Sequence, residues 1–342
     1  MTDVALVRIV FLSNILSFNV TSFRDLMNIR LVNTSWCESI EYYGQFTMWL
    51  HVGKIFINPH KILQLFTKDS MIWLIRNCIE RGCMDLLRKE KYQDQSPLHI
   101  AAGNGATKVI EYLVRDSGYP TEIRDYMLRT PLFEACSHDH RESVNVLLEY
   151  GANIDALDSN KATPLYIACI MGKERCVRAL LSKKTLPKIR GLSPLHISAQ
   201  NNRLECIRAL LDAGYSPNLI NENQESPLHL ACSYGHNKCV NALLIAGANC
   251  DSTTSFGSTS LIYAARGGCT ICIQLLLDAG ASKEMMNQNG ETALSQACFF
   301  GNMAVAELLI KAGCNKQWKN KEFASLEDIV RRRKYIFKNI LQ

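Results

Sequence analysis

The sequence predicts an all-α protein in which pairs of short helices, joined by β-turn fingers, stack into a solenoid preceded by a small helical domain. Three observations favour this fold class. A motif of Ser or Thr, Pro and Leu recurs along most of the chain, a pair of small residues follows most copies, and an apolar stripe with helical spacing then ends near a glycine. Such self-similarity is typical of solenoids, in which each repeat buries its apolar face against its neighbours.

The overall composition excludes several classes of protein. The chain has 342 residues, of which 47% are hydrophobic, which is too apolar for a disordered protein. Its 38 Lys and Arg against 32 Asp and Glu give a net charge of +6, which is small for a nucleic-acid-binding protein. Arg8 and Asn14 interrupt the apolar residues 4–20, and Asp3 stands where a secretory signal needs basic residues. We therefore expect a cytoplasmic protein with reduced thiols that binds neither nucleic acid nor membranes.

Residues 1–66 lack the repeat and carry short apolar segments in a distinctive order. Ile15-Leu16-Ser17-Phe18 is followed by Asp25-Leu26, by a run from Ile29 to Trp36, and by Met48-Trp49-Leu50. This order resembles the F-box, although Ile9-Val10-Phe11 replaces the opening Leu-Pro of that family and a short insertion precedes Asp25. The alternative is an unusual helical cap for the solenoid.

The resemblance to the F-box implies a partner. Members of that family dock on the Skp-type adaptor of a cullin ubiquitin ligase, and a helical segment this short buries too little surface for comfortable stability alone. The matching positions make these the expected adaptor-binding residues: Ile15, Leu16, Leu26, Leu31, Val32, Trp36 and Trp49.

Two further segments are predicted to form the capping helices that a solenoid needs at its ends. Residues 67–90 carry Trp73-Leu74-Ile75 and Met84-Asp85-Leu86-Leu87 on either side of Gly82, which predicts a helix pair without a finger. Residues 321–342 include Ser325-Leu326, one period after Ala293, and the basic run from Arg331 to Lys334. That run is either a solvated helix face or a nuclear-import patch.

Residues 91–320 hold seven copies of the motif. Its second position falls at residues 97, 131, 164, 194, 227, 260 and 293, in steps of 34, 33, 30, 33, 33 and 33. Since Ser and Thr are preferred N-caps and Pro fits the first helical turn, each copy predicts the start of a helix. Small pairs such as Ala101-Ala102 let neighbouring helices approach. A second helix then ends at a glycine suited to a left-handed residue, as at Gly151 and Gly247.

These residues resemble the ankyrin repeat over residues 91–315. The resemblance implies seven ankyrin repeats that stack into a curved solenoid with a protein target on its concave face. One copy departs from the family pattern, because Lys183-Lys184-Thr185-Leu186-Pro187 replaces the usual Gly-Ala-Asn and three residues are missing before Pro194. We expect a distorted finger there.

Most candidate chemical groups recur in step with the repeat, which favours a scaffold role. Stacked helices lie about 8–10 Å apart, beyond the ~7 Å limit for a disulfide, so the recurring cysteines are interpreted as core thiols, with metal or redox roles as the alternative. They are Cys136, Cys169, Cys232 and Cys298 on first helices and Cys176, Cys206, Cys239 and Cys272 on second helices. His99, His196 and His229 share another position and are expected to tie adjacent copies together.

Two short motifs suggest metal binding only weakly. Cys269-x-x-Cys272 lacks the second pair that a zinc knuckle needs, and His138-Asp139-His140 lacks an evident third ligand. No phosphate-binding loop or nucleophile motif appears. We therefore expect no metal, no cofactor and no enzymatic activity.

The resemblance also implies where a target binds. Ankyrin partners contact the fingertips and the turn after the first helix. The fingertip positions lie five, four and two residues before the second motif position, and the turn positions lie six and seven residues after it. Aromatic residues and Arg, which dominate interface hot spots, stand at several of these positions. The resulting candidates are Tyr126, Met127, Arg129, His138, Met171, Tyr234, Phe256, Arg266, Phe299 and Phe300. For the last two, the alternative is packing against the C-terminal cap.

The two resemblances together predict a substrate receptor of a cullin-type, SCF-like E3 ubiquitin ligase, acting in the ubiquitin-conjugation pathway. The F-box would bind the adaptor, and the ankyrin repeats would hold the target. The alternative is an ankyrin-repeat scaffold or inhibitor with no ubiquitin role. A C-terminal SOCS box is disfavoured, because its usual Cys is missing and the chain stops at Gln342.

Overall fold

The computed structural model describes residues 95–183 and 193–317. The segments predicted as an F-box-like domain and as caps lie outside these residues, and so does the finger that we expect to be distorted. The chain divides into two compact units, Met1–Lys161 and Ala162–Gln342, each with its own stacked helices.

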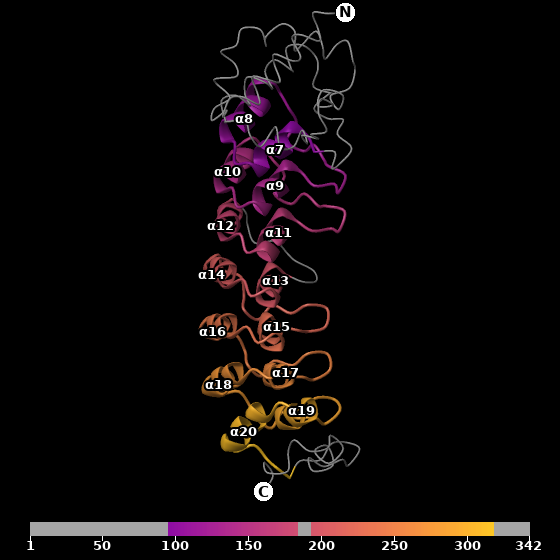
Figure 1. Cartoon of the computed structure of the whole chain (residues 1–342), viewed down its shortest axis with the longest axis vertical. Helices are drawn as coiled ribbons and strands as arrows, with labels where there is room; N and C mark the ends of the chain where they lie inside the picture. The colour runs from indigo at the N-terminus through magenta and orange to yellow at the C-terminus, as the bar shows by residue number, and fades with distance from the viewer. Residues whose placement is uncertain (1–94, 184–192, 318–342) are drawn as a thin grey trace, which may run out of the picture. The chain divides into compact units, whose positions relative to one another are not determined.

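The described part of the first unit contains two helix pairs. Its first helices pack against each other, and each packs on its own second helix (Figure 1). The second helix of the first pair is irregular, because an α-helical turn continues into a π-helical one. The elements are α7 (Pro97–Gly103), α8 (Thr107–Glu111), the π-helix η2 (Tyr112–Asp116), α9 (Pro131–Ser137) and α10 (Arg141–Glu149).

The second unit stacks five helix pairs in two columns. The first helices form one column and the second helices the other, and the fingers project from the column of first helices (Figure 1). The first helices are α11 (Pro164–Met171), α13 (Pro194–Gln200), α15 (Pro227–Ser233), α17 (Ser260–Gly267) and α19 (Ala293–Phe300). The second helices are α12 (Glu174–Ser182), α14 (Leu204–Asp212), α16 (Asn237–Ile245), α18 (Thr270–Asp278) and α20 (Met303–Lys311).

The predicted all-α solenoid of helix pairs is confirmed. Over residues 95–183 and 193–317 there is no β-strand, and the isolated bridge between Thr253 and Thr259 lies in a finger. No helix in the same ranges combines the length and the apolar character needed to cross a membrane.

Each first helix begins at the predicted motif position. The Ser226 hydroxyl accepts a hydrogen bond from the backbone N–H of His229, three residues on, which is the usual geometry of an N-cap. Helices α17 and α19 begin at the same position without Pro, because Thr259 and Thr292 supply the cap. The Ser or Thr is therefore sufficient to set the start of the helix.

In the repeats that carry His99, His196 and His229, the buried histidine ties its repeat to the next, as the sequence predicts. The backbone N–H of Ser226 donates to Nδ1 of His229 at 3.1 Å, so that nitrogen carries no hydrogen. Nε2–H then donates to the carbonyls of Ser252, at 3.0 Å, and Ser258, at 3.2 Å, in the following finger. His196 has the same role in α13 and reaches the Glu225 carbonyl at 2.9 Å. Their scaffold role is confirmed.

The core lies between the two columns of helices and is made of small and aliphatic side chains. The interpretation of the recurring cysteines as core thiols is confirmed, because all eight are buried. Burial raises the pKa of the Cys298 thiol to about 12. The leucine after the second motif position is buried in every repeat: Leu98, Leu132, Leu165, Leu195, Leu228, Leu261 and Leu294.

Candidate protein-binding surface

A single Asp or Asn side chain shapes the tip of several fingers. Oδ1 of Asn221 accepts hydrogen bonds from the backbone N–H groups of Asn223 and Glu225, both at 2.9 Å. Asn287 repeats this arrangement with the residues two and four positions on, and Asp125 does so in the first unit. Because the side chain satisfies backbone donors that would otherwise need water, the tip has a defined shape.

Backbone hydrogen bonds join successive fingers. In the second unit the N–H of Gln288 donates to the carbonyl of Phe256 at 2.9 Å, and in the first unit the N–H of Ser159 donates to the carbonyl of Met127 at 2.8 Å. These bonds hold two predicted target-binding residues at fingertips. Phe256 is 67% exposed there, whereas Met127 is half-buried.

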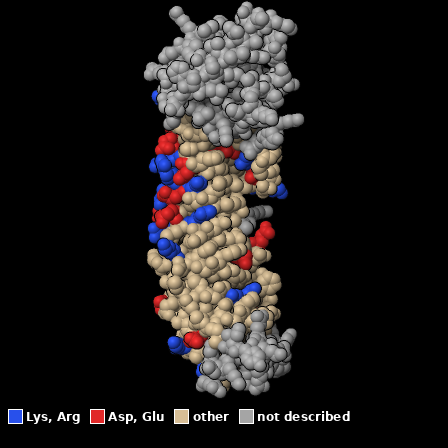
Figure 2. Space-filling model, viewed as in Figure 1, with Lys and Arg blue, Asp and Glu red and all other residues tan. Residues whose placement is uncertain are grey.

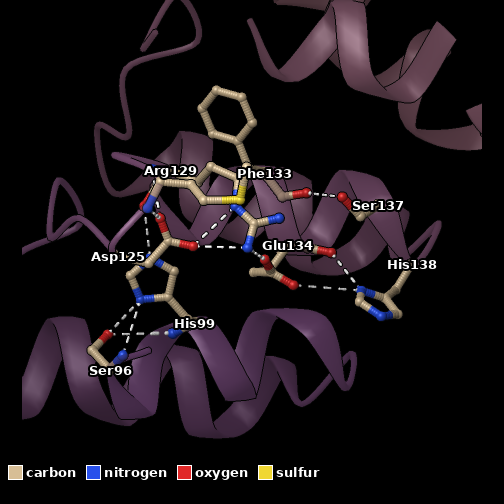
Figure 3. A network of polar contacts seen from close by, with 9 residues as sticks. Ser96, His99, Asp125, Arg129, Phe133, Glu134, Ser137 and His138 are labelled. Atoms are coloured by element: carbon tan, nitrogen blue, oxygen red, sulfur yellow. Dashed lines mark hydrogen bonds and ion pairs between the residues drawn. The ribbon is translucent and has the colours of Figure 1, made fainter. Parts of the chain in front are cut away.

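Of the candidates in the first unit, Arg129 is engaged within the protein. Figure 3 shows its guanidinium between two carboxylates, Asp125 at 2.8 Å and Glu134 at 3.0 Å, and its side chain is only 20% exposed. Tyr126 and His138 are exposed. A target that used Arg129 would have to compete with both carboxylates, so Tyr126 is the stronger candidate in this unit.

The histidines at the turn after α9 do not form a metal site. The rings of His138 and His140 stack with centroids 6.4 Å apart, and His138 Nδ1 donates to the carbonyl of Glu134 at 3.0 Å. Across the described ranges no group of three or more His, Cys, Asp or Glu side chains is placed to hold a metal ion. Burial lowers the pKa of His140, which favours its neutral form.

The second unit exposes four aromatic side chains and one Arg among the predicted target-binding residues, and we call this set the aromatic row. It consists of Tyr234, Phe256, Arg266, Phe299 and Phe300. The guanidinium of Arg266 lies over the Phe300 ring at 5.2 Å from its centroid, and the Phe299 and Phe300 rings meet edge to face at 5.2 Å. These contacts keep the rings of Phe299 and Phe300 and the guanidinium of Arg266 together at the surface of the second unit.

Neighbouring residues hold the rest of the row in place. The Tyr234 hydroxyl accepts a hydrogen bond from the Gln200 side chain at 3.2 Å, and its ring stacks on His236 with centroids 5.9 Å apart. Met171, the remaining candidate, is exposed at the end of α11. The predicted alternative for Phe299 and Phe300, packing against residues 321–342, falls outside the described part of the chain.

Sequence reasoning missed other exposed apolar side chains, of which Ile245 is the most exposed, at 79%. It ends α16, on the column of second helices rather than at a fingertip. A repeat-by-repeat comparison would have found it, because the equivalent position is polar in the other repeats: Glu149, Ser182, Asp212, Asp278 and Lys311.

Charged side chains gather along the edge of the second helices and thin out over α16 and α18 (Figure 2). On α12, Arg178 pairs with Glu174 and with Asp212 of the next repeat, the latter at 3.2 Å. On α14, Arg208 pairs with Glu205 at 3.1 Å. These exposed pairs neutralise each other and contribute little to stability.

Comparison with protein families matches the model described as ankyrin repeats (3 copies), over overlapping segments at residues 66–158, 121–190, 151–221, 184–254 and 228–320. Among solved structures, the ankyrin repeat domain of human ASB11 has a TM-score of 0.59 at 30% identity, and covers 65% of this chain and 99% of that one. The ankyrin repeat domain of Bcl-3 has a TM-score of 0.56 at 26% identity, and covers 63% of this chain and 98% of that one.

Two similar proteins are named as ubiquitin ligases. The E3 ubiquitin-protein ligase XBAT32 of Arabidopsis thaliana is 37% identical over 152 residues, which cover 35% of this chain and 30% of that protein. The probable E3 ubiquitin-protein ligase XBOS32 of Oryza sativa subsp. japonica is 32% identical over 155 residues, which cover 35% and 31%. The chain therefore spans less than a third of the length of either protein.

These relatives contradict one expectation drawn from the sequence. We expected no enzymatic activity because no catalytic motif appeared, yet E3 ubiquitin-protein ligases, the class that names both relatives, are enzymes. The expectation was wrong because it took the lack of a recognisable catalytic motif in this sequence as evidence about activity. A repeat scaffold carries little information about the activity of the whole protein in which it occurs.

Proposed function

Because the chain belongs to the ankyrin-repeat family, we propose that its repeats hold a protein target for ubiquitin ligation. The aromatic row is the observation that carries this proposal, since exposed aromatic rings and an Arg are the side chains that most often anchor protein interfaces. The names of the two plant relatives support the link to ubiquitin ligation.

The chemistry of the row defines the complementary surface of the target. The row offers four exposed rings and one positive charge, that of Arg266, which lies over Phe300. An apolar surface that covers the rings and places a carboxylate or carbonyl oxygen against the guanidinium satisfies both. Burial of the rings supplies most of the affinity, and the oxygen sets the position of the target.

We further propose that residues 1–66 dock on a Skp-type adaptor, so that the chain acts as an SCF-like substrate receptor with a cullin. The support is the order of the apolar segments from Ile15 to Trp49, which matches the F-box. A ligase complex of this kind brings the target held by the repeats close to the site of ubiquitin transfer.

Alanine substitutions in the aromatic row test target binding. Tyr234→Ala, Phe256→Ala, Arg266→Ala and Phe299→Ala should each weaken capture of the target by about 1–3 kcal/mol, a roughly 5- to 150-fold rise in Kd. Ile245→Ala is the control, because it removes a large and even more exposed apolar side chain outside the row. Capture that is unchanged in all four variants, or weakened equally by the control, would contradict the proposal.

Co-purification tests the adaptor. The full-length chain should recover adaptor and cullin, and deletion of residues 1–66 should abolish that recovery. The triple substitution Leu31→Ala, Val32→Ala and Trp36→Ala should have the same effect while the helical circular dichroism of the repeats is kept. The four aromatic-row variants should recover the adaptor normally. Undiminished recovery after the deletion would contradict adaptor docking, and target capture without any adaptor would favour the scaffold or inhibitor.

A further inference from the structure

Two cysteine side chains meet at the start of α18. Cys269 is the N-cap, with φ −88° and ψ 97°, and its sulfur accepts a hydrogen bond from the backbone N–H of Cys272 at 3.3 Å. Cys272 is the third helical residue. N-cap and third-residue side chains face each other at helix starts, as in a capping box. Here that geometry brings two sulfur atoms to 2.8 Å from each other.

The two thiols differ in access to solvent. Cys269 is half-exposed, whereas Cys272 is fully buried. Gly235, in the turn of the preceding repeat, packs against Cys269, whose sulfur donates to the Gly235 carbonyl at 3.8 Å. Because Cys269 is the more exposed of the two, a small molecule meets its sulfur first, and the sulfur of Cys272 lies next to it.

The sulfur separation favours a disulfide over a metal site. It is within about 0.8 Å of a covalent S–S bond of about 2.05 Å, and both residues lie in one helical turn, so closure needs no movement of other elements. A structural zinc needs four ligands, and no cluster of three or more His, Cys, Asp or Glu in the described ranges is placed to bind a metal.

We propose that Cys269 and Cys272 form a site of reversible thiol–disulfide exchange with a low-molecular-weight disulfide such as oxidised glutathione. The thiolate of Cys269 attacks one sulfur of that disulfide, forms a mixed disulfide and releases the first small thiolate. Cys272 then attacks the sulfur of Cys269, and its proton passes to the departing sulfur, so that the second half of the small disulfide leaves as a thiol. Two protein thiols are oxidised to one disulfide while the small disulfide is reduced to two thiols.

Mass spectrometry of one peptide tests the proposal. Trypsin cleaves after Arg266 and Lys283, and the peptide between them contains Cys269 and Cys272 and no other cysteine. After the native full-length protein is incubated with oxidised glutathione and quenched with an alkylating reagent, this peptide should be two hydrogens lighter than its reduced form. It should carry neither alkyl group nor glutathione, and a reductant should reverse the change.

Matched variants distinguish disulfide formation between Cys269 and Cys272 from the ordinary reactivity of a single exposed thiol. Cys272→Ser should leave glutathione attached to Cys269, and Cys272→Ala repeats this test in case Ser disturbs the core. Cys250 is the control thiol. It is half-exposed like Cys269, but its sulfur donates to the Ala279 carbonyl rather than to a second thiol, so it should retain glutathione in the wild-type protein. The proposal fails if Cys269 keeps glutathione in the wild type, or stays reduced when Cys250 is modified.

Discussion

At the scale of single residues, the buried histidines link stability to pH. Nδ1 of His196 and of His229 already accepts a hydrogen bond from a backbone N–H, so a proton there would break that bond. Burial lowers the pKa of both imidazoles below their ordinary value of 6.5. The unfolded chain therefore binds protons at a higher pH than the folded chain does. Their contribution to stability is fully present above pH 6.5 and is lost as the pH falls below it.

This linkage predicts a pH-dependent free energy of unfolding. We expect urea denaturation to give a lower value at pH of about 5.5 than at about 7.5, and the double variant His196→Gln/His229→Gln to show a shallower dependence. An equal slope in the wild type and the double variant would show that other groups cause the effect.

A second residue-scale prediction concerns the glycine that ends α17. Gly268 has φ +74°, and a Cβ there would lie 2.9 Å from Oδ1 of Asn302. The Asn302 amide donates to the carbonyls of Ala265 and Arg266 at the end of the helix, at 2.8 and 3.0 Å. A side chain at this glycine would therefore strain the backbone and also displace the asparagine that caps the helix.

Gly268→Ala should therefore destabilise the protein more than Gly280→Ala does. Both substitutions place alanine at positive φ, at a cost of about 1–2 kcal/mol. Gly280 has nothing within 4 Å of the added Cβ, so only Gly268→Ala should lose a further 1–3 kcal/mol or so from the asparagine contacts. Chemical denaturation of both variants measures the difference, and equal losses would show that Asn302 adjusts without cost.

At the scale of the element, the fingers depend on their Asp or Asn. In the first finger of the described residues, Asp125 accepts hydrogen bonds from two backbone N–H groups and forms an ion pair with Arg129. Arg129 also forms an ion pair with Glu134 (Figure 3). The Asp125 side chain is fully buried in this network. In the second unit, Asn221 makes the same backbone contacts, and its side-chain amide donates to the Glu225 carboxylate at 2.9 Å without forming an ion pair.

Removal of the two side chains should thus have unequal effects. Asp125→Ala leaves a mostly buried Arg short of a partner and should cost about 3–5 kcal/mol, whereas Asn221→Ala should cost about 1–2 kcal/mol. Urea denaturation compares the losses, and Asp125→Asn should recover part of the difference by keeping the backbone contacts. If Asp125→Ala costs no more than Asn221→Ala, the ion pair contributes nothing to stability.

At the scale of the whole molecule, stacking makes the stability of each repeat depend on the repeats next to it. Within the second unit each first helix packs on the next first helix and each second helix on the next second helix. Leu309, in α20, and Leu210, in α14, are both fully buried and sit at equivalent positions of different repeats. A change at either should affect the adjacent repeats before distant ones.

Hydrogen exchange should reveal this locality. Leu309→Ala, which removes about 2–5 kcal/mol of packing, should speed exchange in α19 and α20 much more than in α13. Leu210→Ala should instead speed exchange across α11 to α16, because that repeat has neighbours on both sides. Uniform acceleration in both variants would mean that the second unit unfolds as a single cooperative block.

The sequence alone determined the repeat, the helix starts, the bridging role of His229 and the burial of the cysteines. Each follows from short-range rules. A Ser or Thr side chain accepts a hydrogen bond from the backbone N–H three residues on, and a glycine adopts positive φ without strain. A position that recurs in every repeat has the same surroundings in every repeat. Periodicity therefore allowed one local pattern to be extended to all copies.

The tertiary structure decided what depends on individual deviations from the repeat. It directed Arg129 toward Asp125 and Glu134, exposed Ile245 among the second helices, and brought the sulfur of Cys269 to that of Cys272. The first two depend on which side chains a neighbouring turn or repeat presents, and the third required Cys269 to be the N-cap of α18, which the repeat pattern does not specify. The repeat fixes where a residue stands, and the three-dimensional packing decides what its side chain meets.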